Sequence, residues 1–217
     1  MFSGFTGIIV LANVFVFFAY LFTAYFFNPE IIKLLAIQPE AVLQGKMLWT
    51  FLTSMFTHVE VWHLFANMIS LIFIGGFVEK LIGKKRFIWL YFIGGIVASL
   101  FFVLLAGFFG DSTLGARLFG SPTTFAIGAS GAIFALGGVL AVLTPKMKVL
   151  VFFVIPVPMW IAMILLTFVM WLFSASLSLP IGNTAHLGGL ILGVVYGLYL
   201  RYKYPKKTQM ISRYFGI

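Results

Sequence analysis

Cysteine is absent from the 217 residues, and charged side chains make up only 9% of them. The lack of cysteine excludes disulfides, thiolate catalysis and cysteine-ligated metal sites. Three histidines and five acidic residues leave few other groups for chemistry. An average soluble domain is about 25% charged, whereas this chain is 62% hydrophobic and contains 27 phenylalanines. One water-soluble core cannot hide so much apolar bulk, so the surface of the protein is expected to face lipid.

The apolar residues are grouped in six runs, most of which approach the roughly 20 residues that a helix needs to cross a bilayer. They predict an all-α polytopic membrane protein with six transmembrane helices in a single domain, residues 1–217. The longest connection, residues 28–60, is expected to be a loop. The six runs are Gly7–Phe27, Val61–Val78, Phe87–Phe109, Phe125 or Ala126 to Leu143, Val149–Phe173 and Ala185–Leu200.

The net charge of +9 lies at the ends of these runs. The cations are not interleaved with exposed aromatic residues in a soluble segment, so no nucleic-acid partner is expected. With the N-terminus in the cytoplasm, eleven of the 14 Lys and Arg fall on the inner side. This asymmetry predicts a cell-membrane protein with both termini cytoplasmic, an external loop at 28–60 and a basic cytoplasmic tail at 201–217. The lysine-rich turns are expected to contact the lipid surface.

Four polar side chains inside the runs are expected at one depth, a little below the outer surface. His63 and Asn67 lie in the first two turns of the second run and, four residues apart, share one helix face. Ser130 lies near the outer end of the fourth run and His186 at the outer start of the sixth. Polar groups at membrane depth are costly and by default line a cavity or a functional site. Their common depth therefore predicts one site.

The fourth run has too few residues to cross a bilayer if its helix begins at Ser130. The 14 residues from there to Leu143 rise only about 21 Å. Such a helix begins below the membrane surface, where irregular backbone is tolerated only beside protein or a water-filled cavity. Its first N–H groups and positive end favour a developing oxyanion.

The residue types at this site favour acyl transfer. A serine hydroxyl is a poor nucleophile until a base takes its proton, and the unperturbed pKa of histidine lies near neutral pH. Negative charge then collects on one oxygen, which N–H donors such as those of Asn67 and His63 can stabilise. Amide hydrolysis through an acyl-enzyme is the reaction class that uses all four groups. None of the five acidic residues has a sequence position that predicts contact with His186, so a Ser-His dyad is expected.

Three motifs resemble those of the rhomboid intramembrane serine proteases of the prokaryotic six-helix type. Gly128-Ala129-Ser130-Gly131 is similar to the Gly-x-Ser-Gly motif of that family. Ala185-His186-x-x-Gly189 with Gly193 resembles its sixth-helix histidine motif, and His63-x-x-x-Asn67 resembles its second-helix pair. The order of the motifs, the six runs and the long first loop match as well, so the resemblance covers most of the chain.

The resemblance implies a role for each matching residue. Ser130 would be the nucleophile and His186 the general base. His63 and Asn67, with the backbone N–H of Ser130, would form the oxyanion hole. The substrates implied are transmembrane segments of other membrane proteins, cut near their outer ends, and neither a cofactor nor a metal is implied. The residues implied to pack the helices around the site are Gly128, Gly131, Phe134, Gly189 and Gly193.

The sequence also departs from the family pattern. Phe134 stands where the family often has tyrosine; it can stack beneath the His186 ring but has no hydroxyl. Trp49 matches the first residue of a Trp-Arg pair in the first loop, whereas Thr50 replaces the arginine. Glu79 resembles an acid of the family that is structural, near the cytoplasmic end of the second helix.

The residue pattern also bears on functions other than proteolysis. A channel or transporter would distribute polar residues along a path through the membrane, whereas the inner halves of these runs have almost none. A catalytically dead relative that only binds membrane helices would be expected to lack Ser130 or His186. A zinc pair of His58 and His63 has no accompanying acidic ligand set, so His58 is expected to be structural and hydrogen-bonded within the loop. The sequence carries no signal for the oligomeric state.

Overall fold

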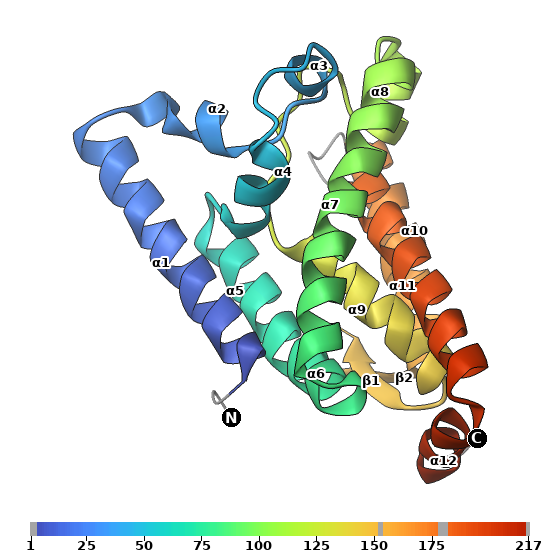
Figure 1. Cartoon of the computed structure of the whole chain (residues 1–217). Helices are drawn as coiled ribbons and strands as arrows, with labels where there is room; N and C mark the ends of the chain where they lie inside the picture. The colour runs from blue at the N-terminus through green and yellow to red at the C-terminus, as the bar shows by residue number, and fades with distance from the viewer. Residues whose placement is uncertain (1–3, 152–153, 178–181, 216–217) are drawn as a thin grey trace.

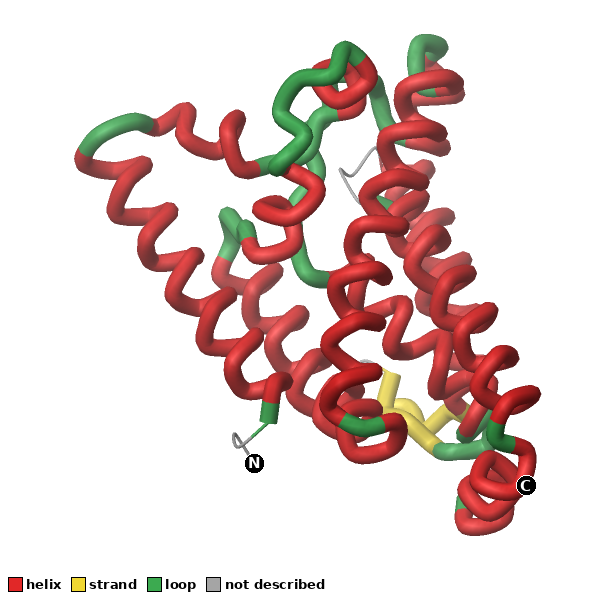
Figure 2. Tube along the Cα trace, in the orientation of Figure 1, coloured by secondary structure: helices red, strands yellow, loops and turns green. Residues whose placement is uncertain are grey.

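The computed structural model describes residues 4–151, 154–177 and 182–215, and most of these are helical (Figures 1 and 2). Five helical segments of this described part are long and apolar enough to cross a membrane, and a sixth apolar helix is shorter. The expected class of polytopic helical membrane protein is therefore confirmed. The long segments are α1 (Phe5–Phe26), residues 61–82, α7 (Lys84–Phe109), α10 (Met159–Leu177) and α11 (Asn183–Lys203); the short helix is α9 (Ser130–Leu143).

The second segment, residues 61–82, is continuous but not uniform. It consists of α5 (Val61–Ser70), the π-helical turn η3 (Leu71–Gly75) and α6 (Gly76–Ile82). A methyl group on Gly75 would lie only 2.8 Å from Cδ1 of Leu71. The wider turn and the missing side chain therefore occur together, within the apolar part of the segment.

The short helix α9 lies at the centre of the bundle, in contact with α7, α10 and α11. Most of its side chains are buried, from Gly131 to Leu143. It begins at Ser130, as expected, and not at the start of the apolar run. Figure 1 shows α9 starting near mid-height of the bundle, and Figure 2 shows the preceding loop descending to that level. The surrounding protein can therefore cover the irregular backbone before the helix.

The outer helices expose apolar side chains that a water-soluble protein would bury. Phe15 of α1 is 73% exposed, and Phe168 and Leu172 of α10 are also exposed. Contiguous apolar surfaces of this kind mark contact with a membrane or a partner. Because they belong to helices that are long and apolar enough to cross a membrane, the surface around the bundle suits the acyl chains of a bilayer.

The expectation of a helix throughout Val149–Phe173 is wrong. The start of this run forms an antiparallel hairpin of β1 (Lys148–Val151) and β2 (Ile155–Pro158). Pro156 and Pro158 account for the difference, because proline in a helix interior removes a backbone hydrogen bond and clashes with the preceding turn. Helix α10 accordingly begins directly after the second proline.

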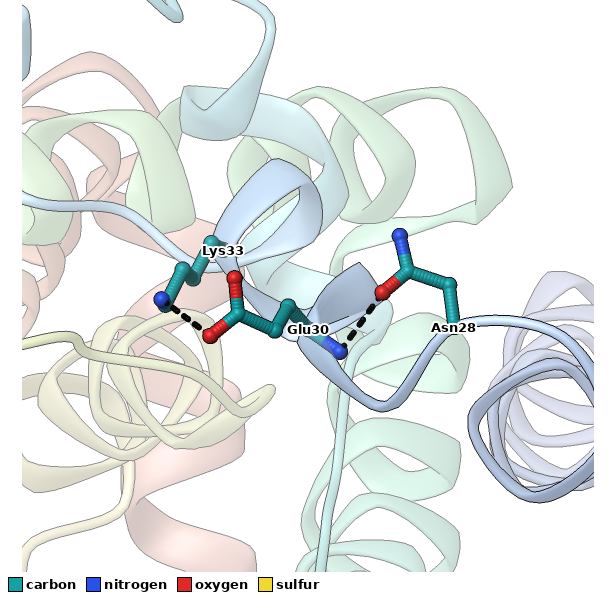
Figure 3. Close-up of polar contacts among 3 residues, drawn as sticks. All are labelled: Asn28, Glu30 and Lys33. Atoms are coloured by element: carbon teal, nitrogen blue, oxygen red, sulfur yellow. Dashed lines mark hydrogen bonds and ion pairs between the residues drawn. The ribbon is translucent and has the colours of Figure 1, made fainter.

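Residues 28–60 are not a plain loop, because several short helices interrupt them. At their start, the side chain of Asn28 accepts a bond of 2.9 Å from the Glu30 N–H, and the Lys33 ammonium lies 2.6 Å from the Glu30 carboxylate (Figure 3). The short helices are η1 (Pro29–Ile31), α2 (Ile32–Leu35), α3 (Pro39–Leu43), α4 (Thr50–Thr53) and η2 (Ser54–Phe56). The connection after α7 likewise contains α8 (Thr113–Phe119).

Several hydrogen bonds hold this segment in place, and two of them concern features expected from the sequence. The indole N–H of Trp49 donates to the backbone oxygen of Leu34 at 2.9 Å, which supports the turn without an arginine at position 50. Ile37 and Ala126 exchange backbone hydrogen bonds of 3.0 and 2.9 Å. The second contact brings the segment against the loop that leads to Ser130.

Glu79, in the middle of α6, joins this helix to the beginning of α1. Its carboxylate accepts bonds of 2.8 Å from the N–H groups of Phe5 and Thr6 and one of 2.7 Å from the Thr6 hydroxyl. A carboxylate at a helix N-terminus satisfies N–H groups that have no partner within the helix and opposes the positive end of the helix dipole. The acid therefore caps the first helix from another segment.

The basic tail expected at residues 201–217 is also helical where it is described. Helix α11 continues to Lys203, and Arg201 and Lys203 in its last turn can interact favourably with the carbonyl end of the helix. A separate helix, α12 (Pro205–Tyr214), follows. Figure 1 shows that α1 begins and α11 ends at the same end of the bundle, where α12 also lies.

Candidate active site

A sharp turn places Ser130 at the first position of α9. The turn passes through Gly128, whose φ of 110° is a conformation that glycine adopts without steric cost. The N–H of Gly128 donates to the backbone oxygen of Ser54 at 2.8 Å. The chain before α9 is thereby fixed to the end of the first long connection.

The hydroxyl of Ser130 lies within hydrogen-bonding distance of His186. The distance from Oγ to the histidine Nε2 is 2.8 Å, across 56 residues of sequence. His186 stands in the first turn of α11 and is only 9% exposed. Its ring stacks on Phe134, one turn after the serine, with centroids 4.4 Å apart and planes 6° from parallel. The imidazole is thus oriented by its packing as well as by the serine.

The other ring nitrogen of His186, Nδ1, is buried and has no hydrogen-bond partner among the described residues. Each of the five carboxylates either has another partner or lies away from His186. Glu30 pairs with Lys33, Glu79 caps α1, and Glu60 is exposed before α5. The remaining two, Glu40 and Asp111, line a cavity of about 570 Å³. Neither Ser130 nor His186 lines this cavity. The arrangement is a pair of residues with no carboxylate bonded to the histidine.

Glycines allow the helices that carry Ser130 and His186 to touch through their backbones. A methyl group on Gly189 would lie 2.1 Å from the backbone oxygen of Gly131, and one on Gly193 would lie 2.1 Å from that of Ala135. Small residues permit this kind of close approach in membrane proteins. Their placement sets the separation of α9 and α11, and so the distance between the two polar side chains.

Substitution Gly189→Ala is expected to destabilise the folded protein, because the added methyl group meets backbone that cannot rotate away. Overpacking typically costs about 1–3 kcal/mol, and a clash with backbone belongs at the upper end. The midpoint of unfolding in mixed micelles of dodecyl maltoside and SDS measures the effect. Gly76→Ala is the matched control, because a methyl group there meets nothing within 4 Å. Equal stability of the two variants would contradict a tight contact between α9 and α11.

His63 and Asn67 lie beside the turn that precedes Ser130. A methyl group on Gly128 would be 2.7 Å from Nε2 of His63 and 3.8 Å from Nδ2 of Asn67. The Asn67 amide also donates to the backbone oxygen of His63 at 2.9 Å, which uses one of its two hydrogens. Gly128 therefore makes room for the side chains of α5 and is not part of the contact between α9 and α11.

Gly131 packs against two helices. Besides its backbone contact with Gly189, a methyl group on it would lie 2.5 Å from Cβ of Ala98 on α7. The first turn of α9 is therefore held between α7 and α11, so Ser130 is carried by tightly packed backbone.

The sequence missed the relation of His58 to this site. His58 is fully buried, as expected for a structural residue, but neither ring nitrogen makes a hydrogen bond of good geometry among the described residues. Its ring meets that of His63 edge to face, with centroids 4.9 Å apart. His58 and His63 are five residues apart, and His58 precedes the start of α5, so helical periodicity does not place them on one face. The turn before the helix brings the two rings together.

Burial, together with the nearby ring of His63, lowers the pKa of His58 from 6.5 to about 4. The unfolded chain accepts a proton that the folded protein resists, so stability that is present above pH 6.5 is lost as the pH falls toward 4. We expect this residue to remove about 2 kcal/mol of the free energy of unfolding between about pH 7.5 and about pH 5. Unfolding midpoints of the native protein and of His58→Gln at the two pH values test this. The same pH dependence in both proteins would refute it.

A second polar contact that the sequence did not indicate lies at the start of α11. The side-chain amide of Asn183 donates to the hydroxyl of Ser174 on α10, and that hydroxyl donates to the backbone oxygen of Trp171 at 3.0 Å. Asn183 is buried, three residues before His186. The contact fixes the first turn of α11 against α10 and so supports the backbone that carries His186.

These observations define a multi-pass helical membrane protein in which a serine at the start of a short central helix is bonded to a histidine. The chain matches the Rhomboid domain family over residues 45–203. It therefore belongs to the rhomboid family, whose members are generally intramembrane proteases, although some relatives are named inactive.

Relatives of both kinds are similar to this chain. It is 35% identical over 161 residues to "Rhomboid protein 1, mitochondrial" of Saccharomyces cerevisiae, an alignment covering 72% of this chain and 43% of the relative. It is 32% identical over 153 residues to "Rhomboid protease GluP" of Bacillus subtilis, covering 70% and 26%. It is 38% identical over 81 residues to "Inactive RHOMBOID-like protein 8" of Arabidopsis thaliana, covering 37% and 23%. The chain thus spans less than half the length of these relatives.

Proposed function

We propose that the protein is an intramembrane serine protease that hydrolyses peptide bonds in or near the transmembrane segments of other membrane proteins. The observation that carries the proposal is the 2.8 Å contact between Ser130 Oγ and His186 Nε2. The membership of a family of generally proteolytic proteins adds to it. A protein that only binds membrane helices has no need of this pair.

In the first step, Oγ of Ser130 attacks the carbonyl carbon of the scissile peptide, and Nε2 of His186 takes the hydroxyl proton. Nε2 can accept that proton only if the neutral ring carries its own hydrogen on Nδ1. Stacking on Phe134 holds the ring in the plane in which Nε2 faces the serine. The imidazolium then gives the proton to the leaving amine, and the C–N bond breaks to leave an acyl-enzyme.

The oxyanion of the tetrahedral intermediate would be stabilised by donors that flank Ser130. The side chains of His63 and Asn67 lie beside Gly128, Asn67 has a second amide hydrogen to donate, and the backbone N–H of Ser130 stands at the positive end of α9. In the second half of the reaction, His186 removes a proton from water, which attacks the ester carbon and releases Ser130. The whole cycle uses a dyad, because no carboxylate is bonded to Nδ1.

The proposed topology has six membrane crossings, of which α9 is the shortest. The single membrane domain occupies residues 1–217, with both termini and the basic tail at 201–217 in the cytoplasm and residues 28–60 outside the cell membrane. The excess of Lys and Arg at the end of the bundle where α12 lies supports this orientation. The active site then opens toward the external side, and neither a metal nor a cofactor takes part.

The proposed substrates are transmembrane helices of other proteins that enter from the surrounding lipid. Peptide hydrolysis requires an extended backbone, so segments that unwind easily near their outer ends, at small residues, are the expected cleavage sites. The exposed apolar surface of the outer helices suits contact with such segments as well as with lipid.

A fluorophosphonate probe tests the proposed chemistry without knowledge of the substrate. We expect covalent labelling of the purified protein at Ser130, detected by mass spectrometry of the modified peptide. Labelling should disappear in His186→Ala and persist after treatment with a chelator. Labelling of another serine, or equal labelling without His186, would contradict the proposed dyad.

A further inference from the structure

We propose that the end of the bundle at α12 carries a binding surface for anionic phospholipid headgroups. We call it the basic terminal surface and define it by Arg86, Lys203, Lys206, Lys207 and Arg213, all of which are exposed. The proposal does not depend on proteolysis, because none of these residues belongs to the Ser130 site.

The position of α12 confines it to the boundary between membrane and water. Helix α11 is mainly apolar from Leu187 to Leu200 and ends at Lys203, and only Tyr204 separates it from α12. One residue spans less than about 4 Å, so α12 must begin where α11 leaves the hydrocarbon. In addition, the ring of Phe215 packs against Phe77 of α6 with centroids 5.5 Å apart. The helix is thereby held against the bundle.

The two sides of α12 differ in the way expected for a helix at a lipid surface. Thr208 is buried and Ile211 is half-buried on the side toward the bundle. The opposite side exposes Met210 and Tyr214 together with lysine and arginine. Apolar and aromatic side chains can enter the headgroup region while the neighbouring cations remain at the phosphates.

Among the described residues, the cations of this surface have no carboxylate partners. The sequence contains no acidic residue after Asp111, and the ion pair found among the described residues, between Glu30 and Lys33, lies in the segment after α1. Several exposed positive charges without counter-charges therefore face the boundary layer. Basic clusters directly beside membrane helices attract anionic lipids, at a gain of about fivefold in affinity per Lys or Arg.

Tyr204 organises part of the surface. Its hydroxyl accepts a bond of 2.8 Å from the guanidinium of Arg86, which also lies 4.7 Å from the centre of the ring. Lys203 lies 5.9 Å from the same ring. The contact joins the start of α7 to the end of α11 and holds two cations near each other. The guanidinium retains further N–H donors in the fork geometry that suits phosphate.

Lipid titration of the purified protein, residues 1–217, tests the proposal. In neutral detergent, native mass spectrometry should show tighter binding of phosphatidylglycerol than of phosphatidylcholine with the same acyl chains. The variant Lys206→Gln/Lys207→Gln/Arg213→Gln should lose this preference by a factor on the order of one hundred. The preference of the native protein should also weaken as salt is added. An unchanged preference in the triple variant would overturn the proposal.

The matched control is Lys33→Gln/Lys46→Gln/Arg117→Gln, which removes the same number of cations from the other end of the bundle. It should keep the preference for phosphatidylglycerol, and an equal loss in both triple variants would show that only net charge matters and overturn the assigned surface. If the first triple variant does not fold, Lys207→Gln alone should lose about fivefold, and no loss would refute the proposal. Ser130→Ala should bind the lipids as the native protein does, which separates this result from the outcome for proteolysis.

Discussion

Ser130→Ala and His186→Ala are each expected to abolish cleavage of a model transmembrane substrate. The first removes the nucleophile, and the second leaves the hydroxyl without the base that lies 2.8 Å away. In serine proteases the loss of either member lowers kcat by a factor on the order of 10⁶, because neither group works without the other. The double variant should therefore be no less active than either single one. Cleavage in detergent or liposomes, followed by gel electrophoresis or fluorescence, measures the effect.

Folding must be separated from chemistry in this experiment. His186→Ala also removes the ring that stacks on Phe134, so its unfolding midpoint should be compared with that of the native protein. Ser99→Ala is a matched control for the serine, because Ser99 lies on α7 and belongs to no proposed catalytic group. It should retain native activity. Near-native hydrolysis by a well-folded Ser130→Ala or His186→Ala would end the interpretation as a serine protease.

Asn67→Ala and His63→Ala are expected to lower kcat by about 10²–10³ each, the usual effect of removing one oxyanion donor. Both side chains lie beside Gly128, at the turn that leads into Ser130. Since the charge they oppose exists only in the transition state, KM should change much less than kcat. If the two donors serve the same oxygen, the double variant should lose less than the product of the single losses.

The control for these variants is Ser70→Ala, three residues after Asn67 at the end of α5 and not among the side chains found beside Gly128. It should retain nearly native kcat. The opposite result for the donors, a change confined to KM even in the double variant, would identify His63 and Asn67 as groups that bind substrate or support packing. His63 also contacts His58, so unfolding midpoints must accompany the kinetics.

Local pattern alone was sufficient for the helical class and for most helix positions. Runs of apolar residues long enough to span a bilayer have few alternatives to a helix, because every backbone polar group must be satisfied within the segment. Helices α1, α7 and α11 accordingly agree with their runs to within a few residues at each end. The expectation of a helix from Val149 onward was wrong because length and hydropathy do not distinguish a hairpin from a helix. The two prolines were the residues that indicated the hairpin.

The candidate site, too, was predicted from the sequence only in part. The sequence placed Ser130, His186, His63 and Asn67 at one expected depth, and motif resemblance gave them roles that await the experiments above. Sequence spacing could not reveal that His58 lies against His63 without a hydrogen bond of good geometry among the described residues, nor that Asn183 bonds to Ser174. Those contacts join different segments through turns, where no periodicity relates one residue to the next.

By itself, the sequence determined that this protein belongs in a lipid environment, that it is helical, and where its rare polar groups stand along each helix. The tertiary structure decided which of these groups meet. The distance between Ser130 and His186 depends on backbone contact at Gly189, and the orientation of the histidine depends on Phe134 and on the short helix that starts inside the bundle. Such distances arise from packing between helices, which a linear pattern of residues allows but does not specify.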